Sequence, residues 1–330
     1  MAASIGRREF VATFGAAAMW PHAGRAQRPA MPTIGFLNSA SADLYAPRAR
    51  AFQQGLGEAG YVAGRNVTIE YRWAEGHYDR LPALAADLVS RNVAVIAASG
   101  AATSAMTAKA ATETIPIVFQ LGNNPVEAGL VASLSRPGGN LTGVTTLAAE
   151  SMQKRLQLMH EIVPMAPLTA VLVNPTNPAA ATQSRDLEAA VRTLGLSVRV
   201  LHASNERDLN TAFATLVQLR AGALVIGADS FLSSKNEPLA ALALRHALPA
   251  IHTYREFAAA GGLMSYGSST TEMYRIVGNY AGRILNGEKP ADMPVHQDDK
   301  VNLIINMKTA KALGLTIPSA LLRRADEVIE

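Results

Sequence analysis

The sequence lacks cysteine, long apolar runs and strongly basic segments. The absence of cysteine excludes disulfide bonds, thiolate catalysis and cysteine metal ligands. No stretch approaches the roughly 18 consecutive apolar residues of a membrane-spanning helix. No run of basic residues is longer than two, so electrostatics gives little support for nucleic-acid binding, and we expect no nucleic-acid partner.

Motifs of enzymes and cofactor sites are also missing. The seven histidines form no closely spaced pair of the kind that binds a metal. No G-x-S-x-G segment marks a catalytic serine, and no glycine-rich segment has the spacing of a phosphate-binding loop. We therefore predict a protein without catalytic residues, metal site or cofactor. The 330 residues, 49% of them hydrophobic and 17% charged, suffice for two globular domains.

The first 26 residues have the order of an export signal. Arg7 and Arg8 precede a weakly apolar stretch, residues 11–20, and small residues then lead to Ala26. The twin arginine indicates the Tat route. We expect cleavage after Ala26 and a mature protein free in the periplasm, because no cysteine follows that could carry a lipid anchor. Alternative cleavage points are Ala23 and Ala30. The other interpretation of this segment is a disordered basic tail.

Short apolar segments alternate with amphipathic ones along the rest of the chain. Apolar segments without polar alternation indicate strands buried on both faces, and a helix after each strand indicates parallel sheets. The predicted strands are residues 33–37, 67–71, 93–97, 115–119, 141–145, 169–173, 197–201, 223–226, 250–252, 263–266 and 301–305. The predicted helices are residues 48–59, 80–90, 180–194, 206–220 and 272–285. The series restarts at Thr169, which predicts two doubly wound halves.

Candidate binding residues follow the first predicted strand. In open parallel sheets, ligands bind outside the carboxyl ends of the strands. Asn38 and Ser39 can hydrogen-bond a polar ligand there, and Tyr45 can stack on an aromatic one. The alternative is that Ser41 or Asp43 caps the next helix.

The loop after the third predicted strand offers Ala101, Ala102 and Thr103 as ligand-binding residues. Small residues let a ligand approach the backbone, and free N–H groups at a helix N-terminus attract a carboxylate. Alternatively, Thr103 or Ser104 is only a helix cap and the small residues serve close packing.

The loop after the fourth predicted strand contains Asn123, Asn124 and Pro125. Two amide side chains and a rigid proline favour a binding loop over a catalytic one. The alternative is a turn whose asparagines are already satisfied, because asparagine tolerates the left-handed conformation.

In the second half, Asn174 and Asn177 lie in a rigid loop of Asn-Pro pairs, and Asp229 follows a later strand. We interpret Asp229 as the partner of a ligand ammonium group, with helix capping as the alternative. The loops together predict a polar cleft for a zwitterion such as an amino acid, or for another small polar or aromatic metabolite. Replacing Asp229 or Asn124 with alanine is expected to weaken binding without affecting folding.

The loop after residues 250–252 adds two candidates. Tyr254 offers an aromatic wall and Glu256 a second carboxylate. Arg255 lies between them and is the alternative partner of Glu256. Further along, Gly267 lies at a predicted hinge, where it can absorb backbone rotation.

Several motifs around these loops stand in a family's characteristic order. They are IPIVF at residues 115–119, a polar loop with proline, GLVASL at 129–134 and RPGGNLTGV at 136–144. This stretch resembles the ABC-transporter substrate-binding proteins of the tryptophan/tyrosine-binding type, and the similarity continues through residues 254–268, 279–295 and 301–318. The resemblance also implies ligand binding at residues 101–103. The family's binders commonly have Thr-Asp before the proline, and the missing aspartate at residues 120–124 counts against an amino-acid ligand.

The resemblance implies the periplasmic-binding-protein type I fold. This is an α/β architecture of two doubly wound parallel-sheet lobes joined by three crossovers, which we place near Ala148, Ser268 and residues 295–299. The first lobe would comprise residues 31–147 plus 268–296, and the second residues 148–267 plus 297–330. The implied function is capture of a small molecule between the lobes and its delivery to an ABC permease, by a monomer. The alternative is a ligand-sensing module for a membrane receptor.

Overall fold

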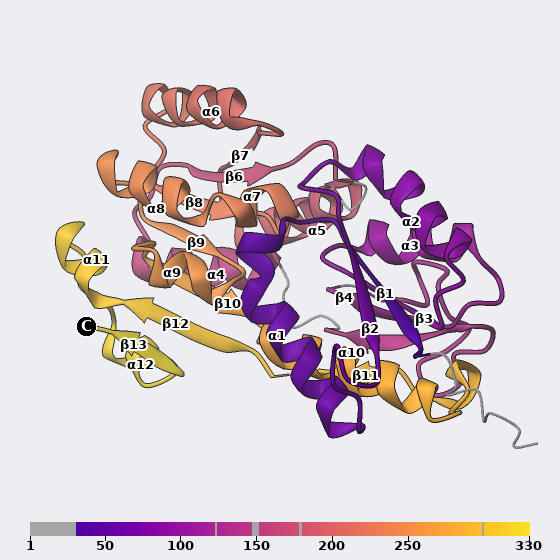
Figure 1. Ribbon diagram of the computed structural model, residues 1–330. Helices are drawn as coiled ribbons and strands as arrows, with labels where there is room; N and C mark the ends of the chain where they lie inside the picture. Colours follow the sequence, from indigo (N-terminus) through magenta and orange to yellow (C-terminus); the bar gives the residue numbers. More distant parts are fainter. Residues whose placement is uncertain (1–30, 123, 147–151, 178–179, 299) are drawn as a thin grey trace, which may run out of the picture. The chain divides into compact units, whose positions relative to one another are not determined.

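Two β-sheets covered by helices form the core of the described chain (Figure 1). The computed structural model describes residues 31–122, 124–146, 152–177, 180–298 and 300–330. Pro32–Glu330 forms one compact unit. Among the described residues, no helix is both long and apolar enough to cross a membrane.

The first sheet has six parallel strands in the order β11-β5-β4-β3-β1-β2. These strands are β1 (Thr33–Asn38), β2 (Thr68–Trp73), β3 (Val95–Ser99), β4 (Ile117–Leu121), β5 (Leu141–Thr145) and β11 (His296–Gln297). The second sheet has seven strands in the order β13-β12-β10-β9-β8-β6-β7. They are β6 (Thr169–Val173), β7 (Val198–His202), β8 (Ala223–Ile226), β9 (Ala250–His252), β10 (Met264–Gly267), β12 (Asn302–Asn306) and β13 (Glu327–Ile329). Only the pairing of β10 with β12 is antiparallel among the described strands.

The helices lie between the strands in sequence. They are α1 (Ala42–Glu58), α2 (Leu81–Ser90), α3 (Ala102–Ala111), α4 (Met152–Ile162), α5 (Ala180–Leu194), α6 (Glu206–Gln218), α7 (Ser230–Ser234), α8 (Asn236–Arg245), α9 (Arg255–Ala259), α10 (Thr270–Leu285), α11 (Met307–Ala312) and α12 (Ser319–Leu322). Two 3-10 turns, η1 (Tyr78–Arg80) and η2 (Pro290–Asp292), complete the assignment.

Each sheet buries both of its faces, as its continuous apolar strands predict. In β1, Ile34 and Phe36 pack with residues of α1 and α10, whereas Leu37 packs with residues of α2 and α3 on the opposite face. The second sheet is covered by α4, α5, α11 and α12 on one face and by α6 to α9 on the other. The carboxyl ends of the strands are thereby left to the loops.

Helix α10 follows β10 of the second sheet but packs on the first. Its buried Met273, Tyr274 and Val277 belong to the same apolar cluster as Ile34 and Phe36 of β1. Backbone atoms of α10 also lie against α1, which comes more than two hundred residues earlier in the chain. The chain therefore crosses from the second sheet to the first between β10 and α10.

The predicted elements agree closely with the structure. Strands β5, β6, β8 and β9 and helix α5 have the predicted bounds, and the other predicted strands are displaced by one or two residues. Helix α1 begins at Ala42 rather than at residue 48 and contains Pro47. Strands β3 and β4 continue to Ser99 and Leu121 because they pair with β1 and β5 to those positions. Residues 98–99 and 120–121 therefore belong to strands, not to the predicted loops.

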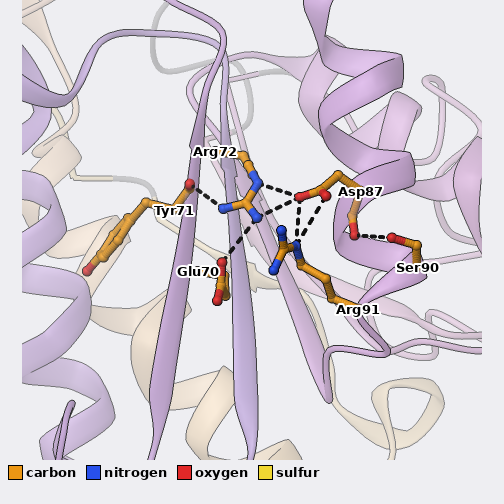
Figure 2. A network of polar contacts seen from close by, with 6 residues as sticks. All are labelled: Glu70, Tyr71, Arg72, Asp87, Ser90 and Arg91. Atoms are coloured by element: carbon orange, nitrogen blue, oxygen red, sulfur yellow. Dashed lines mark hydrogen bonds and ion pairs between the residues drawn. The ribbon is translucent and has the colours of Figure 1, made fainter.

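A network of ion pairs ties the edge strand β2 to α2 (Figure 2). Arg72 on β2 donates to Asp87 of α2 at 2.7 Å and to Glu70 at 3.1 Å, and Arg91 also donates to Asp87. Hydrogen bonds from Arg72 and Arg91 hold the pKa of Asp87 below its usual value. Charged side chains at an edge strand disfavour pairing with another chain.

Candidate functional site

Asn38, at the end of β1, is buried and fully hydrogen-bonded. Its Nδ2 donates to Ser99 Oγ at 3.2 Å and to Tyr274 Oη at 3.0 Å, while its Oδ1 accepts from the Ala40 N–H. Burial raises the pKa of Tyr274, so its hydroxyl stays protonated. The structure thus places the predicted ligand-binding Asn38 in a network that fixes the ends of β1 and β3.

Ser39 joins the first sheet to the second. Its hydroxyl oxygen lies 2.8 Å from that of Ser230, the first residue of α7. Ser230 Oγ also donates to the Gly100 carbonyl at 3.1 Å. Gly100 has a φ of +94°, and a Cβ there would lie 2.5 Å from Asn38 Oδ1, so this close approach requires glycine.

Asp229 accepts four hydrogen bonds. Its Oδ1 accepts from Asn174 Nδ2 at 3.1 Å and from the Leu232 N–H at 3.0 Å, and its Oδ2 accepts from Asn177 Nδ2 at 3.0 Å and Tyr78 Oη at 2.8 Å. The bond to Leu232 is the helix cap of α7 that we considered as the alternative. Burial and the Asp229 charge raise the pKa of Tyr78, which keeps its proton to donate.

The structure brings Asn174 and Asn177 to Asp229, as their positions after neighbouring strands β6 and β8 imply. Asn174 Oδ1 also accepts from the backbone and hydroxyl of Thr176, and Asn177 Nδ2 also donates to the Ala228 carbonyl. Asn174, Asn177 and Asp229 are each at least nine-tenths buried. They form one buried polar cluster at the carboxyl edge of the second sheet.

The predicted aromatic and acidic candidates are linked through Arg48. Tyr45 is only 3% exposed and packs against Tyr274 and beneath the Arg48 guanidinium, so its ring faces the core. Glu256 pairs with Arg48 at 2.9 Å, and the same guanidinium lies over Tyr254. Arg255, our alternative partner for Glu256, instead pairs with Glu327 of β13.

The expected side-chain cap of the helix after β3 is absent among the described residues. Helix α3 begins at Ala102 with Ala101 as its N-cap, and no side chain caps it. Capping by Thr103 or Ser104 is therefore wrong, because both residues already lie in the first helical turn. The Ser104 hydroxyl is buried and has no hydrogen-bond partner among the described residues. A similar correction applies to Ser41, which is the N-cap of α1 without a side-chain bond.

Asn124 forms the satisfied turn that we considered as its alternative. Its Oδ1 accepts from the Val126 N–H at 3.0 Å and its Nδ2 donates to Glu127 at 2.9 Å. Pro125 is buried, and its carbonyl accepts from the Leu130 N–H. Asn123 lies outside the described residues.

Three buried hydroxyl groups in or directly after strands were missed by sequence reasoning. Thr146 follows β5, Thr253 follows β9, and Ser265 lies in β10 beside His252. Their hydroxyl groups are buried without a hydrogen-bond partner among the described residues. Buried hydroxyls are normally satisfied, so these positions suit contact with a polar ligand or water. For Thr146 and Thr253, the position of a threonine directly after a predicted strand could have indicated the site.

His252 is buried and held neutral. Burial, followed by the charges of Arg155 and Arg48, lowers its pKa to about 3. Its Nδ1 accepts from the Tyr254 N–H at 3.2 Å, which places the proton of the neutral ring on Nε2. Nε2 has no hydrogen-bond partner among the described residues.

Stability should fall in acid because of His252. Its pKa is lower in the folded chain than in the unfolded one, so its contribution is complete above about pH 6.5 and is lost as the pH falls toward 3. One group of this kind adds a slope of about 1.4 kcal/mol per pH unit. Urea unfolding between pH 6 and 4 should show a shallower slope for His252→Gln than for the parent protein. Equal slopes would contradict the buried neutral imidazole.

A pocket of about 510 Å³ opens between α1 and the helices α7, α8 and α9. Tyr45 and Arg48 line it from α1, and Asn236, Glu237 and Glu256 line it from the second sheet's helices. No cluster of three or more metal-ligating side chains occurs within the described ranges. Prolines and alanines also line the pocket, so it offers apolar contacts together with hydrogen bonds and ion pairs.

Comparisons with known proteins agree on one class. The chain is 28% identical to the tyrosine-binding protein of Clostridioides difficile (strain R20291) over 271 residues, which cover 82% of this chain and 77% of that protein. The structure of the ABC domain in complex with L-Trp from Streptococcus pneumoniae matches with a TM-score of 0.81 at 25% identity, covering 90% of this chain and 99% of that one. The ligand-free, open structure of CD0873, a Clostridium difficile substrate binding protein, has a TM-score of 0.64 at 26% identity and the same coverage.

These neighbours share the periplasmic-binding-protein type I architecture, which confirms the predicted α/β fold of two parallel-sheet regions. Residues 37–329 match the sequence profile of the ABC transporter substrate binding proteins. The match extends over nearly all of the part of the chain that contains the two sheets. The chain therefore belongs to the ABC transporter substrate binding protein family.

Proposed function

We propose that the chain captures a small aromatic metabolite between the carboxyl ends of its two sheets and delivers it to an ABC permease. The observation that carries this proposal is the family match over residues 37–329. The family is a substrate-binding, non-enzymatic class, located outside the cytoplasm, whose members have a small-molecule ligand and an ABC permease as partners. Because the Clostridioides difficile relative is a tyrosine-binding protein and the Streptococcus pneumoniae structure is a complex with L-Trp, aromatic amino acids are the first compounds to test.

The proposed lobes are those expected from the sequence, residues 31–147 plus 268–296 and residues 148–267 plus 297–330. The hydrogen bonds of Ser39 and Tyr78 to the start of α7 support a site at the boundary between them. Ligand contacts on both lobes would stabilise their closed arrangement, which the permease recognises. Two of the proposed crossover positions, Ala148 and residue 299, lie outside the described residues.

The proposed site combines the sequence candidates with the buried hydroxyls. On the first lobe it includes Ser39, the backbone at Ala101 to Thr103, Asn123, Asn124, Pro125 and Thr146. On the second lobe it includes Asn174, Asn177, Asp229, Thr253, Tyr254 and Glu256. Asp229 already accepts four hydrogen bonds, which favours a positioning role for its carboxylate over a direct ammonium contact.

The proposal includes four properties of the whole protein. Residues 1–26 act as a cleaved Tat signal and the mature protein works as a monomer in the periplasm, without enzymatic activity. The signal segment lies outside the described residues. Detection of a processed N-terminus near residue 27 in a periplasmic fraction, lost when Arg7 and Arg8 are both replaced by lysine, tests the export route. Export of that variant at the parent level would contradict it.

Thermal unfolding with candidate ligands tests the binding function. The chain from residue 27 should be screened against L-tryptophan, L-tyrosine, L-phenylalanine and the matching aromatic acids without an amino group. A ligand at about 100 times its dissociation constant adds about 2.7 kcal/mol to the free energy of unfolding, and a melting shift of several degrees is expected. Stabilisation only by the acids would exclude an ammonium partner. No stabilisation by any compound would contradict an aromatic ligand.

A further inference from the structure

Arg48 connects helices that belong to different sheets. Its side chain is only 5% exposed. Its Nη2 donates to Glu256 Oε1 of α9 at 2.9 Å, and its Nε donates to Thr270 Oγ1, at the start of α10, at 2.9 Å. Helices α1 and α10 cover the six-stranded sheet, whereas α9 covers the seven-stranded sheet. One guanidinium therefore holds α1, α9 and the crossover into α10 together.

Two tyrosines complete the surroundings of Arg48. Its guanidinium carbon lies 4.1 Å from the ring centroid of Tyr45 on α1 and 5.3 Å from that of Tyr254, which precedes α9. A planar guanidinium stacks well on aromatic rings and keeps its in-plane N–H groups for hydrogen bonds. Although burial opposes the charge, Tyr45 and Glu256 hold the pKa of Arg48 above its ordinary value. The cation is therefore permanent.

We propose that Arg48 is a latch that favours the arrangement in which the carboxyl ends of the two sheets face each other. The proposal rests on the proposed function only in naming the ligand site that the latch closes. Other hydrogen bonds also join the loops of the two sheets. Those of Ser230 with Ser39 and Gly100 are between neutral groups, and that of Tyr78 ends on Asp229, which also accepts bonds from its own sheet. Among the ion pairs of the described residues, Arg48–Glu256 is the one that joins α1 to α9.

Of the two residues of the ion pair, Arg48 is buried and Glu256 is accessible to solvent. Glu256 is 48% exposed, and both residues line the 510 Å³ pocket between α1 and α9. Water and salt therefore reach the carboxylate, and high ionic strength should weaken the latch. Loss of an ion pair of this exposure is expected to shift the ratio of open to closed chains about fivefold toward open.

The absence of native cysteine makes a distance measurement direct. One label is attached to a helix of each sheet, through Met106→Cys on α3 and Val217→Cys on α6. The two native side chains are 47% and 52% exposed. Pulsed electron spin resonance between nitroxides at these positions should show one dominant distance in the parent. Glu256→Gln and Arg48→Lys should each add a second, clearly populated distance, with a ratio changed about fivefold.

Arg255→Gln is the matched control. Arg255 also forms an ion pair from α9, but its partner Glu327 lies on β13 of the same sheet. Its removal should leave the distance distribution unchanged. Unchanged distributions in Glu256→Gln and Arg48→Lys, or an equal change in Arg255→Gln, would overturn the latch. Failure of the whole aromatic panel to bind would contradict the proposed function. The distance measurement would still show whether Arg48 favours the closed arrangement, because it needs no ligand.

Discussion

Replacing Gly55 with alanine is expected to lower the free energy of unfolding by about 3 kcal/mol, because α1 and α10 touch backbone to backbone at this position. A Cβ at Gly55 would lie 1.8 Å from the carbonyl oxygen of Arg275 and 2.8 Å from the backbone nitrogen of Asn279. The reciprocal contact is as close, since a Cβ at Gly278 would lie 1.9 Å from the Phe52 carbonyl oxygen. Backbone atoms cannot rotate away as a side chain can, so the helices would have to separate.

Gly57→Ala provides the control in the same helix. A Cβ at Gly57 meets no atom within 4 Å. Alanine there should stabilise the chain by about 0.5 to 1 kcal/mol, because it reduces the conformational freedom of the unfolded state. Denaturant unfolding of both variants measures the contrast. Equal stability of Gly55→Ala and Gly57→Ala would show that the α1–α10 contact is not as close as described.

Replacing Asp229 with alanine should destabilise the fold as well as weaken ligand binding. The substitution removes the cap of α7 and the acceptor of the Tyr78 and Asn174 donors, whereas Asn177 keeps its bond to the Ala228 carbonyl. Unsatisfied buried donors each cost about 1 to 3 kcal/mol, and partial access of water reduces the sum to about 3 to 5 kcal/mol. The structure thereby replaces the sequence-based expectation of intact folding.

Asp208→Ala is the comparison for this change. Asp208 also accepts several hydrogen bonds near a helix N-terminus, from Ser204 and Asn205, but at the surface. Water can replace the lost acceptor there, so the loss of stability should be much smaller. Urea unfolding of both variants makes the comparison. A loss for Asp229→Ala no greater than for Asp208→Ala would contradict the buried polar cluster.

The sheets were predictable because their central strands are short continuous apolar runs bounded by turn residues. Strands β11 and β13 were missed. β11 consists of two polar residues and β13 contains no buried residue, so neither has the apolar pattern of a core strand. The start of α1 was missed as well. Pro47 interrupts the helical pattern, although the helix continues to Ala42 on its N-terminal side.

The polar cluster of the second sheet was predictable in part. Asn174 and Asp229 follow strands that parallel alternation places in one sheet, so their carboxyl ends had to meet at one edge. The role of Tyr78 could not be predicted, because it reaches Asp229 from a turn after an edge strand of the other sheet. The partner of Glu256 was missed for the same reason, since Arg48 lies 208 residues earlier in the chain.

Hydrogen–deuterium exchange tests most directly whether a ligand is held between the two sheets. The measurement compares the chain alone with the chain saturated by the compound of the aromatic panel that stabilises it most. We predict slower exchange in loops of both sheets, at residues 38–41 and 99–104 of the first and at residues 174–177, 228–231 and 252–254 of the second. Protection confined to the loops of one sheet, or absent from all of them, would contradict capture between the sheets.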